Sequence, residues 1–206
     1  MVTVDADVRR VERRLVEGRI VGPCGHALSG WGHARVRVVR GEAGARHVVR
    51  PRRARCASCG ATHVLLPVIL LVRRADTAAV IWAGLVAAGR GLGHRRVAVL
   101  VGVAVSTARG WCRRLAGRAE VLRQQFTAVG CRLDPDPRLP EPAGSPVADV
   151  VAAVAFAADA AMRRWSSRGL TVSAAQIAVS VSGGGLLATA VPLESINTSW
   201  LWQPMR

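Results

Sequence analysis

The sequence predicts an α+β fold, mostly α, in which a small N-terminal β zinc ribbon precedes a helical helix-turn-helix domain and a short helical C-terminal region. Three observations predict this arrangement. Residues 21–67 alternate apolar and polar side chains between glycines, residues 76–132 follow a helical period, and residues 134–146 carry five of the ten prolines. Half of the residues are hydrophobic and 20% are charged, which excludes a disordered chain.

Residues 1–20 are expected to hold an N-terminal helix. Within residues 5–17, the apolar residues Val8, Val11 and Leu15 recur at helical spacing, and charged residues occupy most of the other positions. Such a charged amphipathic helix is unlike the apolar core of a signal peptide. The pattern therefore predicts a helix that covers another element with its apolar side.

Residues 21–72 are expected to form a zinc-ribbon-like β-hairpin module. Arg35 and Arg37 alternate with valines, the pattern resumes in residues 46–55, and the glycine-flanked residues 41–44 supply a turn between them. This predicts a hairpin whose polar face consists of arginines. We expect Arg35 and Arg37 to contact a nucleic-acid backbone.

Residues 73–133 are expected to form a helix-turn-helix domain, with Asp76 capping its first helix. The pair of helices is predicted within residues 93–111. Ala98 is small enough for the helices to cross closely, and Gly102, four residues later, suits the left-handed conformation of the turn. The residues expected to bury the inner faces of the pair are Val97, Val101, Val103, Ala108 and Trp111.

The second helix of this pair, expected over residues 106–115, carries polar and basic side chains. Ser106 or Thr107 can cap it, its first residues would meet base edges, and its later arginines would pair with phosphates. A generic helical hairpin with a solvated basic face is the alternative. The candidate DNA-binding residues of the pair are Arg95, Arg96, Ser106, Thr107, Arg109, Arg113 and Arg114.

A proline-rich linker over residues 134–146 is expected to be semi-rigid and to separate a helical C-terminal region, residues 147–206. Residues 173–176 have the sequence of a capping box, Ser-Ala-Ala-Gln, which predicts the start of a short helix. The region could mediate self-association or bind a partner such as a transposase, with Trp200 and Trp202 on that surface. Simple packing against the helix-turn-helix is the alternative.

The net charge is concentrated in the first part of the chain. All 29 basic residues are arginine, and with 13 acidic residues the formal charge is +16. Residues 1–74 have 15 arginines and five acids, residues 75–118 have seven arginines and one acid, and residues 119–206 have seven of each. This surplus predicts a polyanionic partner for the first 118 residues.

The chain carries no expected membrane span. Its longest apolar runs, residues 64–72 and 77–89, fall short of the roughly 18–20 residues that cross a bilayer. A cytoplasmic location is therefore expected, where thiols stay reduced. In that setting closely spaced cysteines indicate metal binding rather than disulfides.

Cys56 and Cys59 form the strongest chemical motif of the sequence. Two thiolates three positions apart, followed by Gly60, can form a tight turn that presents both sulfurs to one tetrahedral Zn²⁺. A structural zinc site needs two further ligands, usually from a second turn of the same spacing. Cys24 stands in the expected place, but Val21, three residues earlier, cannot bind a metal.

The fourth ligand of the expected zinc site must come from another residue. His26 is the first candidate, ahead of His33 and His47. The alternative is a ribbon without metal whose cysteines are buried as small apolar side chains. The predicted metal ligands are Cys24, His26, Cys56 and Cys59.

These motifs in this order resemble a family of uncharacterised bacterial proteins that pair an N-terminal zinc ribbon with a helix-turn-helix. The resemblance extends over most of residues 8–135, through the cysteine turn, Ala-Thr-His-Val-Leu-Leu-Pro, Arg-Arg-Ala-Asp, and Gly-His-Arg-Arg followed by Ser-Thr-Ala-Arg-Gly-Trp. Those proteins are similar to the DNA-binding front of insertion-sequence transposases. The resemblance implies zinc ligands at Cys24, Cys56 and Cys59 and a reading helix over residues 106–115; Val21 departs from its paired cysteines.

Together the observations predict a double-stranded-DNA-binding protein, a transposition accessory or a regulator. An RNA-binding or ribosome-associated zinc ribbon is the alternative. No catalysis is expected, because a recombinase needs a carboxylate-bearing sheet that binds two metals. The residues after the linker are too few for that sheet and hold three acids, Asp149, Asp159 and Glu194.

Overall fold

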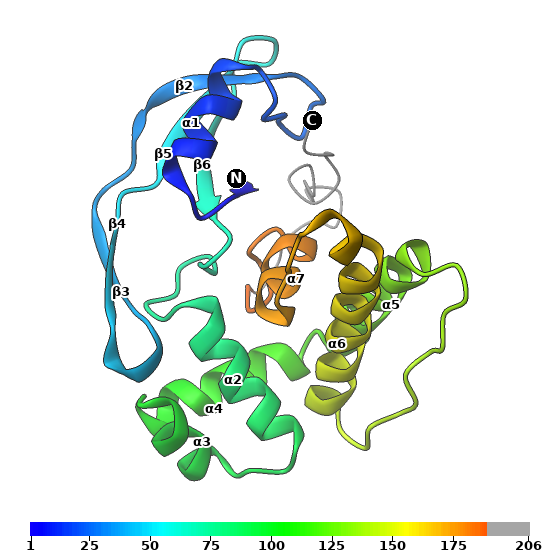
Figure 1. Ribbon diagram of the computed structural model, residues 1–206. Coiled ribbons are helices and arrows are strands. Elements are labelled where there is room, and N and C mark those ends of the chain that lie inside the picture. The colour runs from blue at the N-terminus through cyan, green and yellow to red at the C-terminus, as the bar shows by residue number, and fades with distance from the viewer. Residues whose placement is uncertain (189–206) are drawn as a thin grey trace.

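The computed structural model describes residues 1–188 and divides into an N-terminal sheet and a helical region (Figure 1). Glu194, Trp200 and Trp202 lie outside the described residues. The expected partner surface at the two tryptophans lies there too. The fold is α+β and mostly helical, as predicted. Across residues 1–188 every helix is too short or too polar to cross a membrane.

The N-terminal sheet has four strands in the order β1-β6-β5-β2. These are β1 (Val2–Val4), β6 (Thr62–Pro67), β5 (Arg52–Cys56) and β2 (Leu28–His33). β1 is parallel to β6, and the other neighbours are antiparallel. The predicted N-terminal helix forms as α1 (Val8–Val16), but β1 before it was not predicted from the sequence. The core of this part comprises Val2, Val4, Val11, Leu15, Ile20, Leu28, Ala54, Cys56 and Leu65.

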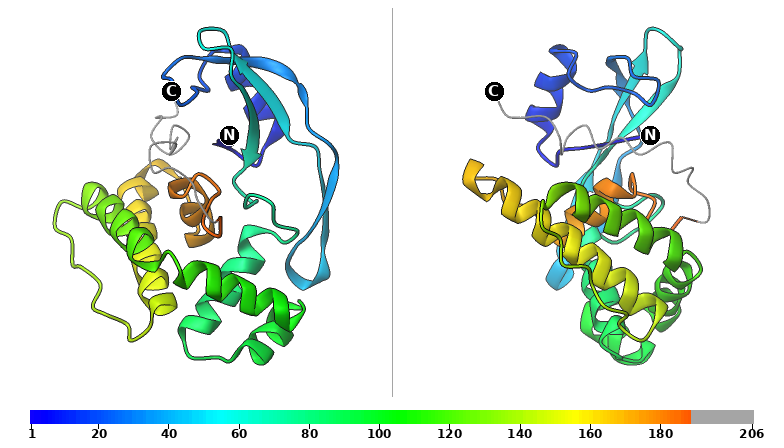
Figure 2. Two further views of the ribbon diagram at one scale, coloured as in Figure 1. Left: turned by 180° about the vertical axis from the view of Figure 1, so that it is seen from behind. Right: turned by 90° about the vertical axis from the view of Figure 1, so that its right-hand side faces the viewer.

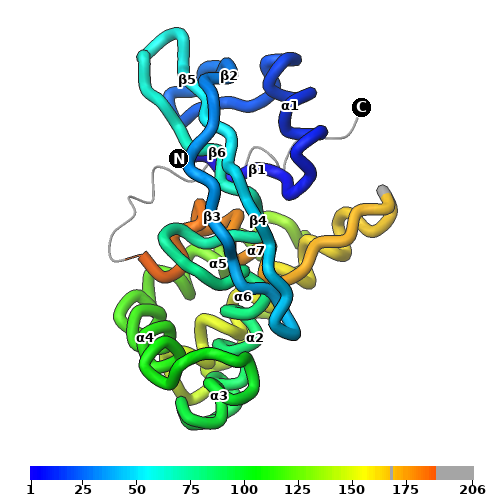
Figure 3. The backbone as a smooth tube through the Cα atoms, turned by 90° about the vertical axis from the view of Figure 1, so that its left-hand side faces the viewer, coloured from blue at the N-terminus to red at the C-terminus, as the bar shows by residue number. Residues whose placement is uncertain are grey.

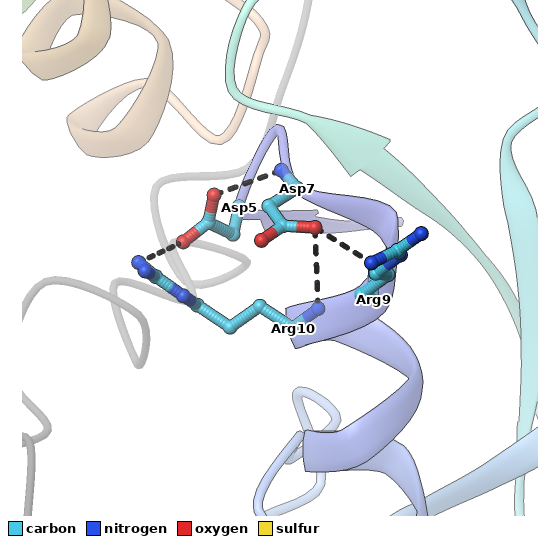
Figure 4. Close-up of polar contacts among 4 residues, drawn as sticks. All are labelled: Asp5, Asp7, Arg9 and Arg10. Carbon is cyan, nitrogen blue, oxygen red and sulfur yellow. Dashed lines mark hydrogen bonds and ion pairs between the residues drawn. The ribbon is translucent and has the colours of Figure 1, made fainter.

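Helix α1 begins at Val8 because Asp7 caps it. The Asp7 carboxylate accepts hydrogen bonds from the backbone N–H groups of Arg9 and Arg10, at 2.9 and 3.5 Å (Figure 4). Asp5 in turn accepts from the backbone N–H of Asp7 at 2.9 Å and pairs with the Arg10 guanidinium at 2.8 Å. Residues 5–7, expected to be helical, instead form the cap.

The predicted hairpin forms from β3 (Arg37–Arg40) and β4 (Arg46–Val49), with the short 3-10 helix η1 (Glu42–Gly44) in the turn. It extends from the sheet to the level of the helices (Figures 1 and 3). The prediction that arginines form its polar face is wrong for Arg37. Val39, on the same side of β3 as Arg37, is fully buried against Leu66 and Leu70, and Arg37 is half-buried.

The opposite face of the hairpin carries exposed valines instead of arginines alone. Val38 and its cross-strand partner Val48 are 46% and 73% exposed. Each strand has two consecutive valines, 38–39 and 48–49, so alternation alone does not decide which of each pair turns inward. Contact with Leu66 and Leu70 decides it.

The hairpin is joined to the helical region at Arg40. Its backbone N–H donates to the carbonyl of Ala75, and its carbonyl accepts from the N–H of Thr77, both at 2.8 Å. Its guanidinium Nε lies 2.9 Å from the carboxylate of Asp76, which is 3% exposed. Asp76 is therefore not the helix cap that was expected. Thr77 caps the helix, with its Oγ1 accepting from the N–H of Val80.

The helical region comprises six α-helices within the described residues, and the linker separates the fourth of them from the fifth. α5 and α6 lie side by side, and α7 packs between them and the sheet (Figures 1 and 2). Residues 134–145 form neither helix nor strand, as the prolines predicted. The helices are α2 (Ala78–Gly89), α3 (His94–Val101), α4 (Val105–Ala116), α5 (Ala119–Leu133), α6 (Pro146–Trp165) and α7 (Ala174–Val181), with the 3-10 helix η2 (Ser166–Arg168) after α6.

One hydrophobic core runs through this region on both sides of the linker. Ile81 and Leu85 of α2, Phe126 of α5 and Val150 and Val154 of α6 are fully buried in it. The capping box at the start of α7 is present as predicted. Through residue 188, the segment after the linker therefore packs against the helix-turn-helix, which was one of the two alternatives for it.

Candidate metal centre and helix-turn-helix

The three predicted cysteine ligands come together at the end of the sheet farthest from the helices. Cys56 ends β5, Cys59 lies in the turn after it, and Cys24 lies in the loop between α1 and β2. The Sγ atom of Cys24 is 3.4 Å from that of Cys56 and 3.5 Å from that of Cys59. The three sulfurs lie within 4.8 Å of one another.

Two tight turns present these sulfurs. The N–H of Gly60 donates to the carbonyl of Cys56 at 3.0 Å, and Gly60 has a φ of +71°, which suits glycine. Around Cys24, the N–H of Gly22 donates to the carbonyl of His26 at 2.9 Å. Val21, three residues before Cys24, forms a backbone bridge with Ala27 and closes this loop. The turn around Cys24 therefore forms without a metal-binding side chain at position 21.

The spacing of the sulfurs fits a tetrahedral metal ion. A Zn–S bond of about 2.3 Å implies sulfur atoms about 3.8 Å apart. The two shortest separations, 3.4 and 3.5 Å, are within a few tenths of an ångström of that value and far from a disulfide bond. Three cysteines in the described residues therefore form a group that could bind a metal ion.

The surroundings of the cluster favour a thiolate on Cys56. Hydrogen bonds from the backbone N–H of Cys59 and from the Cys24 thiol lower the pKa of Cys56 from 9.0 to about 7, although burial opposes them. The backbone N–H of His26 lowers the pKa of Cys24, but hydrogen bonding with Cys56 and Cys59 outweighs it and the net shift is upward. Loss of a proton is thus favoured at Cys56 over Cys24.

None of the three candidate histidines belongs to this group within residues 1–188. His26 is exposed, and its Nδ1 lies 3.0 Å from the backbone carbonyl of Cys24, which leaves its Nε2 without a partner among the described residues. His33 ends β2 and pairs with Arg52, and His47 lies in β4 opposite Val39. Of the three histidines, His26 is the nearest in sequence to a cysteine of the group.

Helices α3 and α4 form the predicted pair with the predicted turn. Gly102 has φ +68° and ψ +38°, in the left-handed region, and the N–H of Val103 donates to the carbonyl of Ala98 at 3.0 Å. Such a turn favours glycine, because a Cβ atom is disfavoured in this conformation. Of the residues expected inside the pair, Val101 and Val103 are half-buried, and Val97, Ala108 and Trp111 are buried; Ala98, expected where the helices cross, is buried too.

Helix α4 begins one residue earlier than predicted, and its cap differs. It starts at Val105 with Ala104 at the N-cap, and no side chain caps it. Ser106 and Thr107 lie in its first turn, so the prediction that one of them caps the helix is wrong. Their hydroxyl groups are consequently not engaged by the helix end.

A further glycine, not singled out in the sequence, positions this pair against α2. A Cβ atom on Gly84 would lie 3.2 Å from the Trp111 ring and 3.4 Å from Val97. The absence of a side chain there lets α4 approach α2 closely. The signal for it was a glycine inside an apolar helix, which often marks a packing requirement.

The outward face of α4 is basic and polar. Ser106, Arg109 and Arg113 are exposed, and Thr107 and Arg114 are half-buried. Gly110, on the same helix, is buried because the Arg114 guanidinium lies over it and donates to its carbonyl at 3.1 Å. Among residues 1–188, the exposed arginine side chains Arg35, Arg95, Arg96, Arg109 and Arg113 make no hydrogen bond or ion pair.

Three arginines that the sequence reasoning did not assign lie beside the start of α4. Arg40, Arg73 and Arg74 line a pocket of about 330 Å³ with Ser106 and Arg114. The Arg-Arg-Ala-Asp motif carries two of them and was noted only as part of a resemblance. Nothing local in the sequence indicated that it meets α4, because the contact depends on the hairpin anchor at Arg40.

No protein-family model, no curated protein and no solved structure matches this chain. Two features of the described residues bear on function. One is the group of three cysteines at the far end of the sheet. The other is a helix-turn-helix whose outward face carries uncompensated arginines.

Proposed function

We propose that this protein binds double-stranded DNA, with α4 in the major groove and the ribbon against the backbone, and acts as a transposition accessory or a regulator without catalytic activity of its own. The observation that carries the proposal is the two-sided character of α4. Ala108, Trp111 and Leu115 are buried on one side, and the other side presents Ser106, Arg109 and Arg113. A helix needs an unoccupied polar face of this kind to enter a groove.

The dimensions and donors of α4 suit this role. Its 12 residues are about 18 Å long, and a helix fits the roughly 12 Å width of the major groove. Ser106, Thr107 and Arg109 in its first half would meet base edges, where arginine recognises guanine. Arg113 and Arg114 in its last half would pair with phosphates.

The first helix of the pair supports the same orientation. Arg95 and Arg96 are exposed at the start of α3, where they would contact the backbone flanking the groove. Together with the charge of the first 118 residues, this predicts a strong dependence of affinity on salt concentration. Self-association or a transposase partner, bound through the C-terminal region, is part of the same proposal.

Within this proposal the cysteine cluster holds Zn²⁺ through Cys24, Cys56 and Cys59, and the fourth ligand is His26. A bound zinc ion would link the two turns as a structural cross-link and would supply no chemistry to a substrate. The Nδ1 contact of His26 with the Cys24 carbonyl leaves Nε2 available to a metal. Cobalt substitution tests this ligand, because the Co²⁺ absorption spectrum should change in His26→Ala and not in His33→Ala.

The decisive test selects bound duplexes from random DNA and compares variants on the selected site. Arg109→Ala should lose discrimination between the selected and an unrelated sequence, because a base contact is removed. Arg138→Ala is the matched control, since Arg138 is equally exposed but lies in the linker. Binding that is insensitive to both salt and Arg109→Ala would overturn the proposal.

A second candidate, an RNA-binding or ribosome-associated ribbon, is favoured by one observation. Trp31 of β2 is 52% exposed, and the Arg55 guanidinium lies 4.9 Å from its ring centroid. An exposed aromatic ring beside an arginine can stack with unpaired bases. Tighter binding of structured RNA than of duplex DNA, lost in Trp31→Ala and retained in Arg109→Ala, would favour this candidate.

A further inference from the structure

The pocket beside α4 gathers arginines from three separate segments. Arg40 ends β3, Arg73 and Arg74 lie between β6 and α2, and Arg114 lies in α4. Figure 1 shows the hairpin reaching the corner of the molecule where α2 and α4 lie. The remaining lining residues are Ala75, Asp76, Ser106, Thr107 and Trp111.

Positive charge in this pocket exceeds negative charge. Among the described residues, Asp76 is the single carboxylate of the lining, and it is already paired with the Nε of Arg40 at 2.9 Å. Arg73, Arg74 and Arg114 have no acidic partner within the described residues. Guanidinium groups that line one pocket repel one another, and a bound anion would offset that repulsion.

Two of these arginines are held in place by the backbone. The Nη2 of Arg74 donates to the carbonyl of Leu187 at 2.6 Å, and its Nε is buried and has no hydrogen-bond partner among residues 1–188. Arg114 is held by its contact with the carbonyl of Gly110. Burial and the charge of Arg114 lower the pKa of Arg74, so folding brings these cations together at a cost. An unpartnered buried N–H in such a setting indicates a missing acceptor.

Arg73 completes the pocket from an uncommon backbone conformation. Its φ is +56°, in the left-handed region that non-glycine residues rarely occupy. Its side chain is exposed and makes no hydrogen bond or ion pair with residues 1–188. The Ser106 and Thr107 hydroxyls at the uncapped start of α4 add neutral donors to the same pocket.

We propose that this pocket binds one phosphate group, held by Arg73, Arg74 and Arg114. The inference rests on the proposed function, because it assigns the phosphate to the backbone of the DNA that α4 reads. Arginine forms bidentate hydrogen bonds with phosphate oxygens, and three guanidinium groups suit a group with negative oxygens on several sides. The contact would fix how deeply and in which register α4 sits in the groove.

The first experiment uses duplex DNA and replaces Arg73 by glycine. Since Arg73 has a positive φ, glycine relieves the backbone, and loss of binding in Arg73→Gly does not reflect misfolding. We expect weaker binding to all duplexes alike, with sequence discrimination retained. The slope of log affinity against log salt should fall by about 0.9, so that affinity lost between 50 and 200 mM salt shrinks ~3.5-fold. Arg138→Ala should leave the slope unchanged.

The second experiment uses inorganic phosphate without DNA, because a free phosphate offers the same chemistry. Thermal unfolding of the full chain is followed during titration with phosphate against chloride at equal ionic strength. Saturable stabilisation in the wild type that is absent in Arg73→Gly supports the pocket. If that result came with no binding to any duplex, the DNA function would be wrong while the phosphate site stood.

The opposite pattern overturns the inference alone. If the wild type and Arg73→Gly bound DNA with the same affinity and the same salt slope, the pocket would not contact the backbone, although α4 could still read DNA. Arg114→Gln, which removes the charge from the other side of the pocket, provides an independent second variant. Equal salt slopes in both variants and the wild type would contradict the proposal.

Discussion

The sheet and the helical region of this protein are stabilised in different ways. Within residues 1–188, the main core cluster of the helical region has 28 buried residues, including Trp111, Phe126 and Trp165. The core of the four-stranded sheet has nine buried residues, none of them aromatic, and one of the nine is Cys56. A region with so small a core generally needs a cross-link or a metal. Burial of apolar side chains therefore accounts for the helical region, whereas the sheet has a small core beside three cysteines that could bind a metal ion.

The largest expected effect is the unfolding of the sheet while the helical region stays folded. In the zinc-bound protein proposed above, removing the metal with a chelator, or replacing Cys56 by serine, should unfold the sheet, because a structural zinc contributes on the order of 10 kcal/mol in small zinc domains. Hydrogen exchange should then accelerate in β2, β5 and β6 and stay slow in α5 and α6. Cys112→Ser is the control, since Cys112 is buried among the helices outside the cluster. Unchanged exchange in the sheet after complete metal removal would contradict the comparison.

A core truncation should affect the helical region with a smaller magnitude. Phe126 is fully buried, and Phe126→Ala should lower the free energy of unfolding of the helices by about 3–5 kcal/mol. Urea denaturation followed by helical circular dichroism measures the change. Zinc content should remain that of the wild type, because the cluster lies in the other region. Val121→Ala, at a position 43% exposed on the same helix, should change the stability by less than about 0.5 kcal/mol.

A substitution in the turn between α3 and α4 should lower the stability by less than the core truncation does. Gly102→Ala places a Cβ atom at φ +68° and should cost about 1–2 kcal/mol in the helical region. Gly93→Ala is the matched control, because Gly93 has a φ of −65° and open space around a Cβ. Thermal unfolding of both variants gives the comparison. Equal melting temperatures would show that the left-handed turn is not required.

The smallest expected effect concerns the ion pair that ties the linker to α6. The hydrogen bond from Arg163 holds the pKa of Asp134 below its ordinary value of 3.8. The pair therefore stabilises the folded state above that value, and the contribution disappears as the pH falls through the lowered pKa. The melting temperature of Asp134→Asn should be slightly below that of the wild type at pH 7, and the two should converge in acid. A difference that persisted at pH 2 would exclude this cause.

The parts of the fold with local signals could be predicted from the sequence. Gly102, the proline run and the capping box at Ser173 each act over a few residues, and the structure has the turn, the linker and the helix start where they indicate. The candidate metal ligands Cys56 and Cys59 also form a local motif. Their meeting with Cys24 followed from the expected pairing of two turns.

The features that could not be predicted, such as the cap of α2, strand β1 and the buried face of the hairpin, depend on contacts between residues far apart in the chain. Asp76 has the sequence context of a helix cap, but its carboxylate forms an ion pair with Arg40, which lies 36 positions earlier. β1 has only three residues, too few for a periodic signal, and forms because β6 offers a parallel edge. The face of the hairpin was likewise decided by Leu66 and Leu70, which no alternation within the hairpin reveals.

Arg74 and Arg118 donate hydrogen bonds to backbone carbonyl groups of residues 185–188, a structural role separate from any contact with DNA. Arg118 donates to the carbonyls of Gly185 and Ala188, at 2.6 and 3.0 Å, and Arg74 donates to that of Leu187. An arginine side chain carries about 2 kcal/mol of rotamer entropy, most of which is lost when it is fixed. For Arg74 that loss occurs during folding, so the phosphate proposed for the pocket would meet a donor that is already oriented. A short uncharged segment thereby acts as a template that sets the direction of a cation more than 100 residues away in sequence.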